Sequence, residues 1–142
     1  MEDKSHLTAR HRVKLSTPMK YLQGRVRLGH RTLDYGCGRG FDADQLGMDK
    51  YDPTFFKTVP TGKYDIVTCI YVLNVVDKPT QNVILENILC LLKDGGCGYV
   101  AVRRDPTRDG YTSLGTYNRY VILDKPVFKR VKGSFCIYTM TK

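Results

Sequence analysis

Short apolar runs separated by polar turns recur along this chain, which is the pattern of an α/β fold. Residues 31–35, 65–70 and 98–103 form such runs, and we expect each to be a strand. The run at 65–70 is apolar at nearly every position, as in a central strand buried on both faces. Residues 80–93 instead space their apolar side chains as a helix does, and Asp94-Gly95-Gly96 is expected to end that helix. The pattern therefore predicts a mostly parallel sheet with a helical crossover.

The two ends of the chain add elements of other kinds. Residues 119–123 and 134–140 read as a C-terminal antiparallel strand pair. Near the N-terminus, Pro18 is expected to open a helix, with Ser16 or Thr17 available as its cap. That helix either covers the sheet or presents its basic residues to phosphates.

The net charge of +9 is unevenly distributed along the 142 residues. Residues 1–31 carry eight basic against two acidic residues, and residues 103–142 carry nine against three. Residues 32–102 carry six against nine. Basic flanks beside a slightly acidic core indicate an anionic partner, with nucleic acid the leading candidate and a merely solubilising surface the alternative.

The composition also argues against several classes of protein. No apolar run approaches the ~20 residues that a membrane span needs. The first residues lack the apolar core of a signal peptide, so we expect a cytoplasmic protein. The five cysteines are odd in number and lack Cys-x-x-Cys spacing, which predicts reduced thiols and no metal site.

A glycine-rich turn follows the strand at 31–35, with Gly36, Gly38 and Gly40 at every second position. Glycine tolerates positive φ and lets a ligand lie directly against the backbone. Such a turn between a strand and a helix is where α/β folds bind nucleotides. Phe41 stands where a dinucleotide fingerprint needs its third glycine, and the Gly-Lys-Ser/Thr of a P-loop is absent. A phosphate site and a structural turn that binds no ligand are the lesser alternatives for this glycine-rich turn.

Two stretches resemble the motifs of class I S-adenosylmethionine (SAM) dependent methyltransferases. They are Leu33-Asp34-Tyr35-Gly36-Cys37-Gly38-Arg39-Gly40, and Tyr64-Asp65-Ile66-Val67 with the turn Tyr71-Val72-Leu73-Asn74-Val75-Val76. The resemblance spans roughly residues 30–105. Within that family, Arg10-His11-Arg12-Val13-Lys14-Leu15-Ser16-Thr17-Pro18 is similar to a segment of methyltransferases associated with bacterial DNA phosphorothioation and of small phage relatives. The resemblance implies a Rossmann-like class I methyltransferase fold, SAM as cofactor and methyl transfer as the reaction.

This chain is trimmed relative to that family. Only residues 41–46 separate the glycine loop from the second strand, expected at 47–53, so the first crossover helix is little more than one turn. Residues 54–63 are too few for the usual helix–strand–helix, so the third strand is expected to be missing together with the acidic motif that contacts adenine. We expect a single domain over 1–142, made of a basic segment at 1–29, a SAM-binding core at 30–105, and a C-terminal loop and strand pair at 106–142.

Ligands of open α/β sheets bind beyond the carboxyl ends of the strands. A carboxylate there accepts both hydroxyl protons of a ribose, and we expect Asp52 in that role with Asp49 as the fallback. By resemblance, Asp34 orients the methionine ammonium, and the backbone around Cys69 and Ile70 holds the same end. The predicted cofactor-binding residues are Asp34, Gly36, Cys37, Gly38, Gly40, Asp49, Asp52, Cys69 and Ile70.

Methyl transfer is an in-line displacement in which orientation supplies most of the acceleration. Tyr71 and Asn74 occupy the place where enzymes that methylate the amino groups of DNA bases carry an Asp/Asn-Pro-Pro-Tyr/Phe motif, so that reaction is less expected. His11 is the third candidate for catalysis, as a base or a substrate ligand, with a plain surface histidine as the alternative.

Three arginines are expected to bind the substrate: Arg12, Arg103 and Arg104. The sequence thus predicts a SAM-dependent methyltransferase that acts on nucleic acid, DNA or RNA. Its alternatives are methylation of a small molecule or a protein, and a non-catalytic SAM-binding adaptor.

Overall fold

A computed structural model describes the whole chain except residues 1–5, 7–8, 10, 106–107 and 114. Within the described residues, the main sheet has six strands in the order β2-β1-β3-β4-β8-β7. They are β1 Thr32–Tyr35, β2 Asp49–Tyr51, β3 Tyr64–Ile70, β4 Leu92–Arg103, β7 Val127–Val131 and β8 Phe135–Thr141. The first four are parallel, β8 runs against β4, and β7 runs against β8. This confirms the predicted mostly parallel sheet with a C-terminal antiparallel pair.

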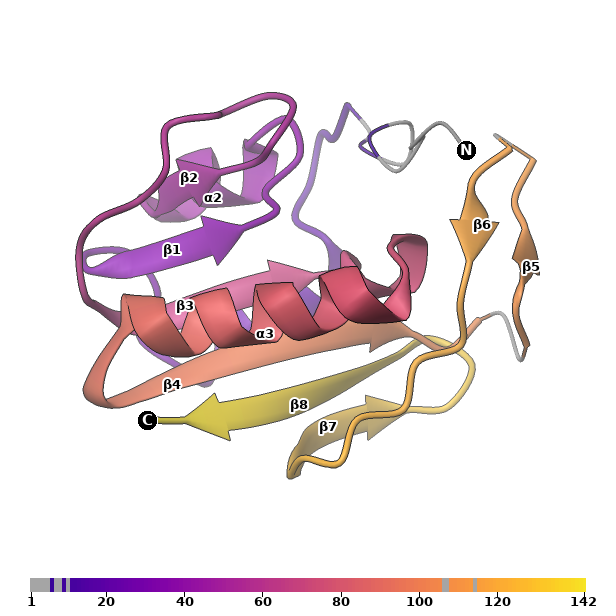
Figure 1. The fold of residues 1–142 in the computed structure, drawn as a ribbon. Helices are drawn as coiled ribbons and strands as arrows, with labels where there is room; N and C mark the ends of the chain where they lie inside the picture. The colour runs from indigo at the N-terminus through magenta and orange to yellow at the C-terminus, as the bar shows by residue number, and fades with distance from the viewer. Residues whose placement is uncertain (1–5, 7–8, 10, 106–107, 114) are drawn as a thin grey trace.

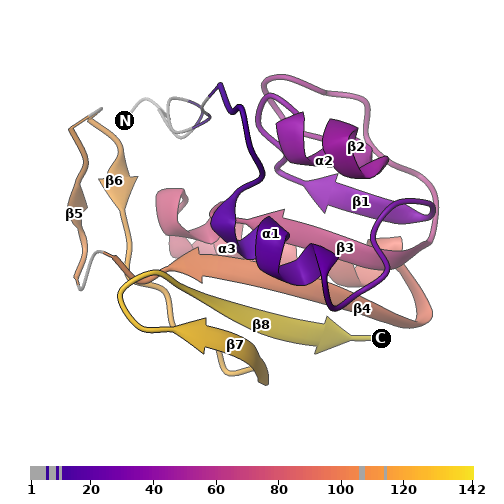
Figure 2. The same cartoon turned by 180° about the vertical axis from the view of Figure 1, so that it is seen from behind.

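Helices cover both faces of the sheet (Figures 1 and 2). The helix α3, Lys78–Leu91, covers one face, and α1, Thr17–Gln23, covers the other. Each helix buries its apolar side chains in a separate core cluster: Ile84 and Ile88 of α3 in one, Met19 and Leu22 of α1 in the other. The helical spacing at 80–93 is therefore confirmed. Among the described residues, no helix is both long and apolar enough to span a membrane.

The trimmed crossovers are confirmed as well. The helix α2, Phe41–Leu46, is a single short element between β1 and β2. Residues 52–63, all described, connect β2 to β3 with a single bridge, between Asp52 and Phe56, and without a helix or a further strand. β2 is consequently the outer strand of the sheet on that side.

The C-terminal strand pair is formed by different residues from those predicted. Residues 119–123 form no strand, and β8 pairs instead with Val127–Val131. The alternation at 119–123 is real, since Val121 and Leu123 are buried in the core. This alternation shows only which side chains face the core. The backbone of Arg119 bonds to the short 3-10 helix η2, Leu73–Val75, and, within the described part of the chain, to no strand of the sheet. Side-chain periodicity alone did not specify the backbone partner.

Two other boundaries differ from the sequence prediction. The helix α3 ends at Leu91 and the chain enters β4 at once, so residues 94–96 lie in the strand rather than after the helix. The stretch 106–117, expected to be a loop or a short helix, contains β5, Gly110–Tyr111, which pairs with β6, Tyr117–Asn118.

The strands β1, β3 and β4 end at the same edge of the sheet (Figure 1). The N-terminal segment flanks this edge on one side, and the β5–β6 hairpin flanks it on the other. Segments from both basic ends of the chain therefore meet where the strands of the acidic core end.

Candidate functional site

A cavity of about 690 Å³ lies at this edge. It is lined by the glycine loop, the residues after β2 and β3, the first part of α3, the N-terminal segment and the β5–β6 hairpin. Its volume is within the range of cavities that hold cofactors and drug-sized ligands. Among the described residues, no group of three or more His, Cys, Asp or Glu side chains is arranged to hold a metal ion.

The glycine loop is fastened to the end of β2. The amides of Gly36 and Cys37 both donate to the carbonyl of Tyr51, at 2.7 and 3.0 Å. Gly36 has a φ of 79°, and a Cβ there would lie 2.4 Å from Cγ2 of Val72, in the turn after β3. Only glycine lets the loop pack this closely, which places loop backbone along the cavity wall.

The carboxylate of Asp52 is held in the cavity wall by backbone amides. Gly38 donates to its Oδ2 at 2.9 Å, while Thr54 and Phe55 donate to its Oδ1 at 2.8 and 3.2 Å. Oδ1 is thus fully used by two amides, whereas Oδ2 keeps a lone pair that can accept a further hydrogen bond from a ligand. The structure brings Asp52, but not Asp49, to the cavity: Asp49 is exposed at the start of β2, where the hydroxyl of Tyr64 donates to it at 2.7 Å. This placement favours Asp52 over the fallback Asp49, whose role stays a prediction.

Asp34 is a buried carboxyl group at the end of β1. It is 3% exposed, lines the cavity, and accepts a hydrogen bond from the hydroxyl of Thr68 at 2.9 Å. Burial raises its pKa to about 7; the Thr68 hydrogen bond and Arg12 oppose that shift, and the carboxylates of Asp42 and Asp52 add to it. The protonated form is thus more favoured than in an ordinary aspartate, and a cation bound beside the group would favour the ionised form.

Asp42 is a cavity residue that the sequence reasoning missed. It is buried in α2, where it accepts hydrogen bonds from both the amide and the hydroxyl of Ser16, at 3.0 and 2.6 Å. Ser16 does occupy the cap position of α1, but its hydroxyl makes no cap bond and donates to Asp42 instead. This link fastens the N-terminal segment to α2, and Arg12 of the same segment lines the cavity. The sequence signal was weak, because an acid in the first turn of a helix is common.

Tyr71 stands where β3 ends, in a conformation that is unusual for tyrosine. Its φ is 62°, and its amide donates to the carbonyl of Ala101 at 2.9 Å. Non-glycine residues in this region are strained by about 1 kcal/mol or more, and such residues gather at functional sites. Its half-buried side chain lines the cavity, and burial raises its pKa further. The phenol is therefore protonated at neutral pH and can orient an acceptor but not act as a base.

Asn74 lies outside the cavity, contrary to its predicted catalytic role. Its side chain is fully buried: Nδ2 donates to the carbonyl of Arg119 at 2.7 Å, and Oδ1 accepts from the amide of Arg103 at 2.8 Å. These bonds join β4 to the segment after the hairpin. Asn74 therefore holds the cavity wall together and is not among the residues that line the cavity.

The predicted substrate arginines divide into two groups. Arg12 and Arg103 line the cavity, and the guanidinium of Arg103 also pairs with Asp105. Arg104 does not line it, because its guanidinium donates to the hydroxyl of Tyr138 at 2.9 Å and lies over the ring of Tyr120. The sequence analysis expected Arg104 to bind the substrate, but its side chain does not line the cavity.

The remaining predicted residues are placed as follows. His11 is exposed and does not line the cavity, and the neighbouring Arg10 of the same motif lies outside the described residues. Cys69 is fully buried behind the wall, whereas Ile70 lines it. Cys37 lines the cavity, but burial raises its pKa to about 12, so its thiol is neutral. Gly36, Gly38 and Gly40 line the cavity as predicted.

A largely apolar wall beside Asp52 was also missed. The rings of Tyr35 and Tyr51 lie 4.9 Å apart, and Nδ2 of Asn87 in α3 donates to the Tyr35 hydroxyl at 3.0 Å. Val76 and Ile84 extend this wall. The spacing of the α3 residues is the same for core and cavity positions, so the sequence did not separate the two.

Comparisons with known proteins agree with this geometry. The family model of a methyltransferase domain matches residues 7–125. No curated protein matches the chain by sequence. Among solved structures, a SAM-dependent methyltransferase from Mesorhizobium loti has a TM-score of 0.57 at 9% identity, over 86% of this chain and 94% of that one.

Two further structures are similar at a TM-score of 0.54. The N-methyltransferase NodS from Bradyrhizobium japonicum, in complex with S-adenosylhomocysteine (SAH), is 12% identical over 87% of this chain and 83% of its own. The other is the 1,6-didemethyltoxoflavin N1-methyltransferase of Burkholderia thailandensis, with 1,6-didemethyltoxoflavin and SAH bound. It is 13% identical over 97% of this chain and 78% of its own. At such identities the likeness shows the fold.

Proposed function

Because the chain belongs to the methyltransferase domain family and is a SAM-dependent methyltransferase, we propose that the acceptor of its methyl group is a nucleic acid. The observation that carries the proposal is the meeting of segments from both basic flanks at the cavity. Arg12 reaches it from the N-terminal segment and Arg103 from the end of β4, on either side of an acidic core. A small ligand does not require such extended positive charge, whereas a phosphate backbone is attracted by it.

The residues of the cavity fit SAM. The free lone pair on Oδ2 of Asp52 suits a hydroxyl donor of a ribose, and the apolar wall of Tyr35, Tyr51 and Val76 suits an adenine ring. Asp34 suits the ammonium of the methionine part, since a cation there relieves the cost of its buried charge. SAM supplies an electrophilic methyl group on its sulfonium. The apolar wall thus takes the place of the missing third-strand motif.

On the acceptor side, the residues of the cavity suit orienting the acceptor better than removing a proton from it. Tyr71 is protonated at neutral pH, so its hydroxyl can bond to the acceptor and fix its direction. Arg12 and Arg103 can bond to phosphates on either side. Orientation of this kind is able to supply most of the acceleration of a displacement.

Methylation of a small molecule is the second candidate, because the similar Burkholderia structure holds one in its site. A non-catalytic adaptor is set aside, since the chain belongs to an enzyme family. The narrower kinship with phosphorothioation-associated and phage enzymes stays a prediction, as does the cytoplasmic location.

The test is transfer of a radiolabelled methyl group from SAM to mixed-sequence DNA and RNA, compared with pools of small amines and with protein. We expect label in nucleic acid. The variant Arg12→Gln should lower that transfer roughly five- to tenfold while SAH affinity stays within a few-fold. Arg31→Gln is the matched control, because Arg31 is exposed and pairs with Asp65 at the start of β3. Label in small molecules or protein alone would overturn the proposal.

A further inference from the structure

The β5–β6 hairpin presents tyrosine side chains beside the cavity. Tyr111 pairs with Tyr117 across the hairpin, and their rings lie 5.0 Å apart and nearly perpendicular. Tyr111 is 68% exposed, and Tyr120, which follows the hairpin, is 37% exposed. Tyrosine is enriched at binding interfaces, because its ring can pack against a partner while its hydroxyl stays hydrogen-bonded.

Guanidinium groups alternate with these rings. The Cζ of Arg119 lies 4.8 Å from the centre of the Tyr117 ring, and that of Arg104 lies 4.5 Å from the centre of the Tyr120 ring. We call these five residues, Arg104, Tyr111, Tyr117, Arg119 and Tyr120, the tyrosine–arginine surface. The guanidinium of Arg104 therefore belongs to this surface and not to the lining of the cavity.

Two acids nearby are already engaged. Asp105 pairs with Arg103, and Oδ1 of Asp109 accepts a hydrogen bond from the amide of Tyr120 at 2.8 Å. Neither carboxylate is therefore paired to Arg104 or Arg119 in these contacts. A third acid, Asp77, whose pKa is lowered chiefly by its bond to Thr80, also interacts with the charge of Arg119. Arg104, which bonds to the hydroxyl of Tyr138, therefore offers the more available positive charge to an anion.

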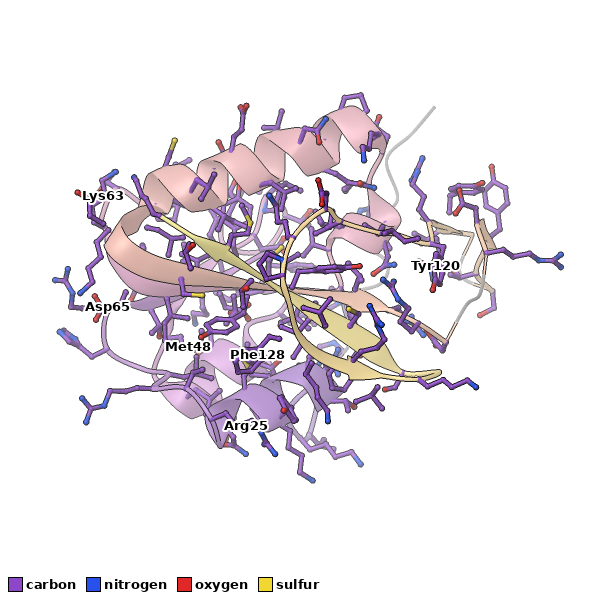
Figure 3. The ribbon with its side chains drawn as sticks, turned by 90° about the horizontal axis from the view of Figure 1, so that it is seen from below. Arg25, Met48, Lys63, Asp65, Tyr120 and Phe128 are labelled. Atoms are coloured by element: carbon purple, nitrogen blue, oxygen red, sulfur yellow. The ribbon has the colours of Figure 1, made fainter. Side chains whose placement is uncertain are left out.

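The tyrosine–arginine surface is attached to the site and continuous with it. The amide of Arg119 donates to the carbonyl of Asn74 at 2.6 Å, directly after β3. Thr112 and Asn118 of the hairpin line the cavity itself. Figure 3 shows Tyr120 at the end of the molecule that carries the hairpin, with Lys63 and Asp65 at the opposite end.

One atom of the hairpin also lacks a partner. The amide oxygen of Asn118 is buried and, among the described residues, accepts no hydrogen bond. Such an atom costs free energy, and a hydrogen-bond donor entering beside the hairpin would remove that cost.

We propose that the tyrosine–arginine surface is a stacking platform for the bases that flank the acceptor nucleotide, so that the substrate is a single strand or an unpaired loop. This inference rests on the proposed nucleic-acid function. Unpaired bases stack on tyrosine rings and guanidinium planes, whereas the bases of a duplex are already stacked on one another. The alternation of rings and cations suits a strand that presents bases and phosphates in turn.

The experiment measures the affinity of labelled single-stranded oligonucleotides and matched duplexes by fluorescence anisotropy at one low salt concentration. Tyr111→Ala and Tyr120→Ala together should weaken single-strand binding roughly 10- to 100-fold, because each lost stack is worth about 5-fold or more. Tyr111→Phe and Tyr120→Phe keep both rings and should bind within about twofold of the wild type. Ile122→Ala is the matched control, since Ile122 is 69% exposed on the same segment and has no ring. Unchanged SAH affinity in every variant shows that the cavity is intact.

Single-strand binding that depends on the two rings supports the platform. Equal affinity for duplex and single strand, or an alanine variant that binds as well as the phenylalanine variant, overturns the platform and leaves the proposed function standing. If no nucleic acid binds at all, both fail together.

Discussion

Single carboxyl groups perform separate tasks in this cavity, and their surroundings decide which. Asp52 is fixed by three backbone amides and keeps a lone pair on Oδ2 that a ligand's hydroxyl group could use. Asp34 is buried with one hydroxyl partner, and its pKa is raised to about 7. Asp49, although also beside β1, is drawn away by the hydroxyl of Tyr64. Each difference can be tested by one substitution.

Asp52→Ala should weaken SAM and SAH binding by about 1.5–3 kcal/mol, or 10- to 100-fold, because charge-assisted bonds to the ribose are lost. Calorimetry with SAH measures the change. The matched control is Asp49→Ala, which should leave the affinity within about twofold, since Asp49 does not reach the cavity. Equal losses in the two variants would contradict the assignment.

Asp34 predicts a dependence of binding on pH. A bound ammonium requires the ionised carboxylate, so SAH affinity should rise from pH 6 to pH 8, through the pKa of about 7. Asp34→Asn should bind more weakly and lose most of this dependence. Calorimetry at three pH values over that range is the measurement, and an unchanged slope in the variant would refute the role of Asp34.

The same group predicts the pH dependence of stability. Its folded pKa of about 7 lies above the ordinary 3.8, so the folded state holds more protons between these values. Stability contributed by this site should therefore fall as pH rises from about 4 to 7. Asp34→Asn should be more stable than the wild type at pH 8, by a few kcal/mol at most, with the gap closing toward pH 4. A gap in melting temperature that does not vary with pH would count against it.

At the scale of elements, α1 and α2 are joined by one buried contact. Asp42 of α2 accepts both polar hydrogens of Ser16, at the start of α1. Since α1 buries Met19 and Leu22 completely, this contact also decides where the N-terminal segment enters the cavity wall. The segment's place in the site thus depends on a buried contact with α2 as well as on its own residues.

Asp42→Ala should lower the free energy of unfolding by about 1–3 kcal/mol, because it leaves the Ser16 amide and hydroxyl without a partner. It should also weaken SAH binding, since the N-terminal segment loosens. Asp44→Ala on the same helix is the control: its carboxylate pairs with Lys50 on the surface, where such pairs contribute less than about 1 kcal/mol. Chemical denaturation compares them, and equal losses would show that the buried link adds nothing.

At the scale of the whole molecule, the order of the strands decides where the acidic core and the basic flanks lie relative to each other. The sheet carries acidic residues at its strand ends, while the two basic flanks pass over the same edge. The sheet order places β3 between β1 and β4, and all three strands end at this edge. A polyanion crossing the edge would contact both flanks.

Nucleic-acid affinity should therefore fall steeply with salt. If three or four phosphates are neutralised, the logarithm of the binding constant should change by about −2 to −4 per log unit of salt. Titrations between low and physiological salt give the slope. Lys63→Ala, at the opposite end of the molecule (Figure 3), should not alter it. A flat response would assign the charge to solvated surface.

The sequence by itself determined the elements whose signal is local. The sequence predicted the fold from the glycine spacing, the apolar run of β3 and the short crossovers. It also predicted that the cavity lies at the strand ends and that Asp52 lines it. Local backbone preference and the period of side-chain burial are properties of neighbouring residues, so they can be read along the chain.

Only the tertiary structure decided which distant groups meet. It places Asp52 in the cavity wall, whereas Asp49 bonds to Tyr64 outside it. It buries Asn74 against Arg119, outside the cavity, and bonds Asp42 to Ser16. It also replaced the strand predicted at 119–123 by Val127–Val131. Burial period tells which side of an element faces the core but not its partner, and a shift of one residue along a strand turns a side chain to the other face. The partners depend on packing across the whole fold, which no short stretch of sequence contains.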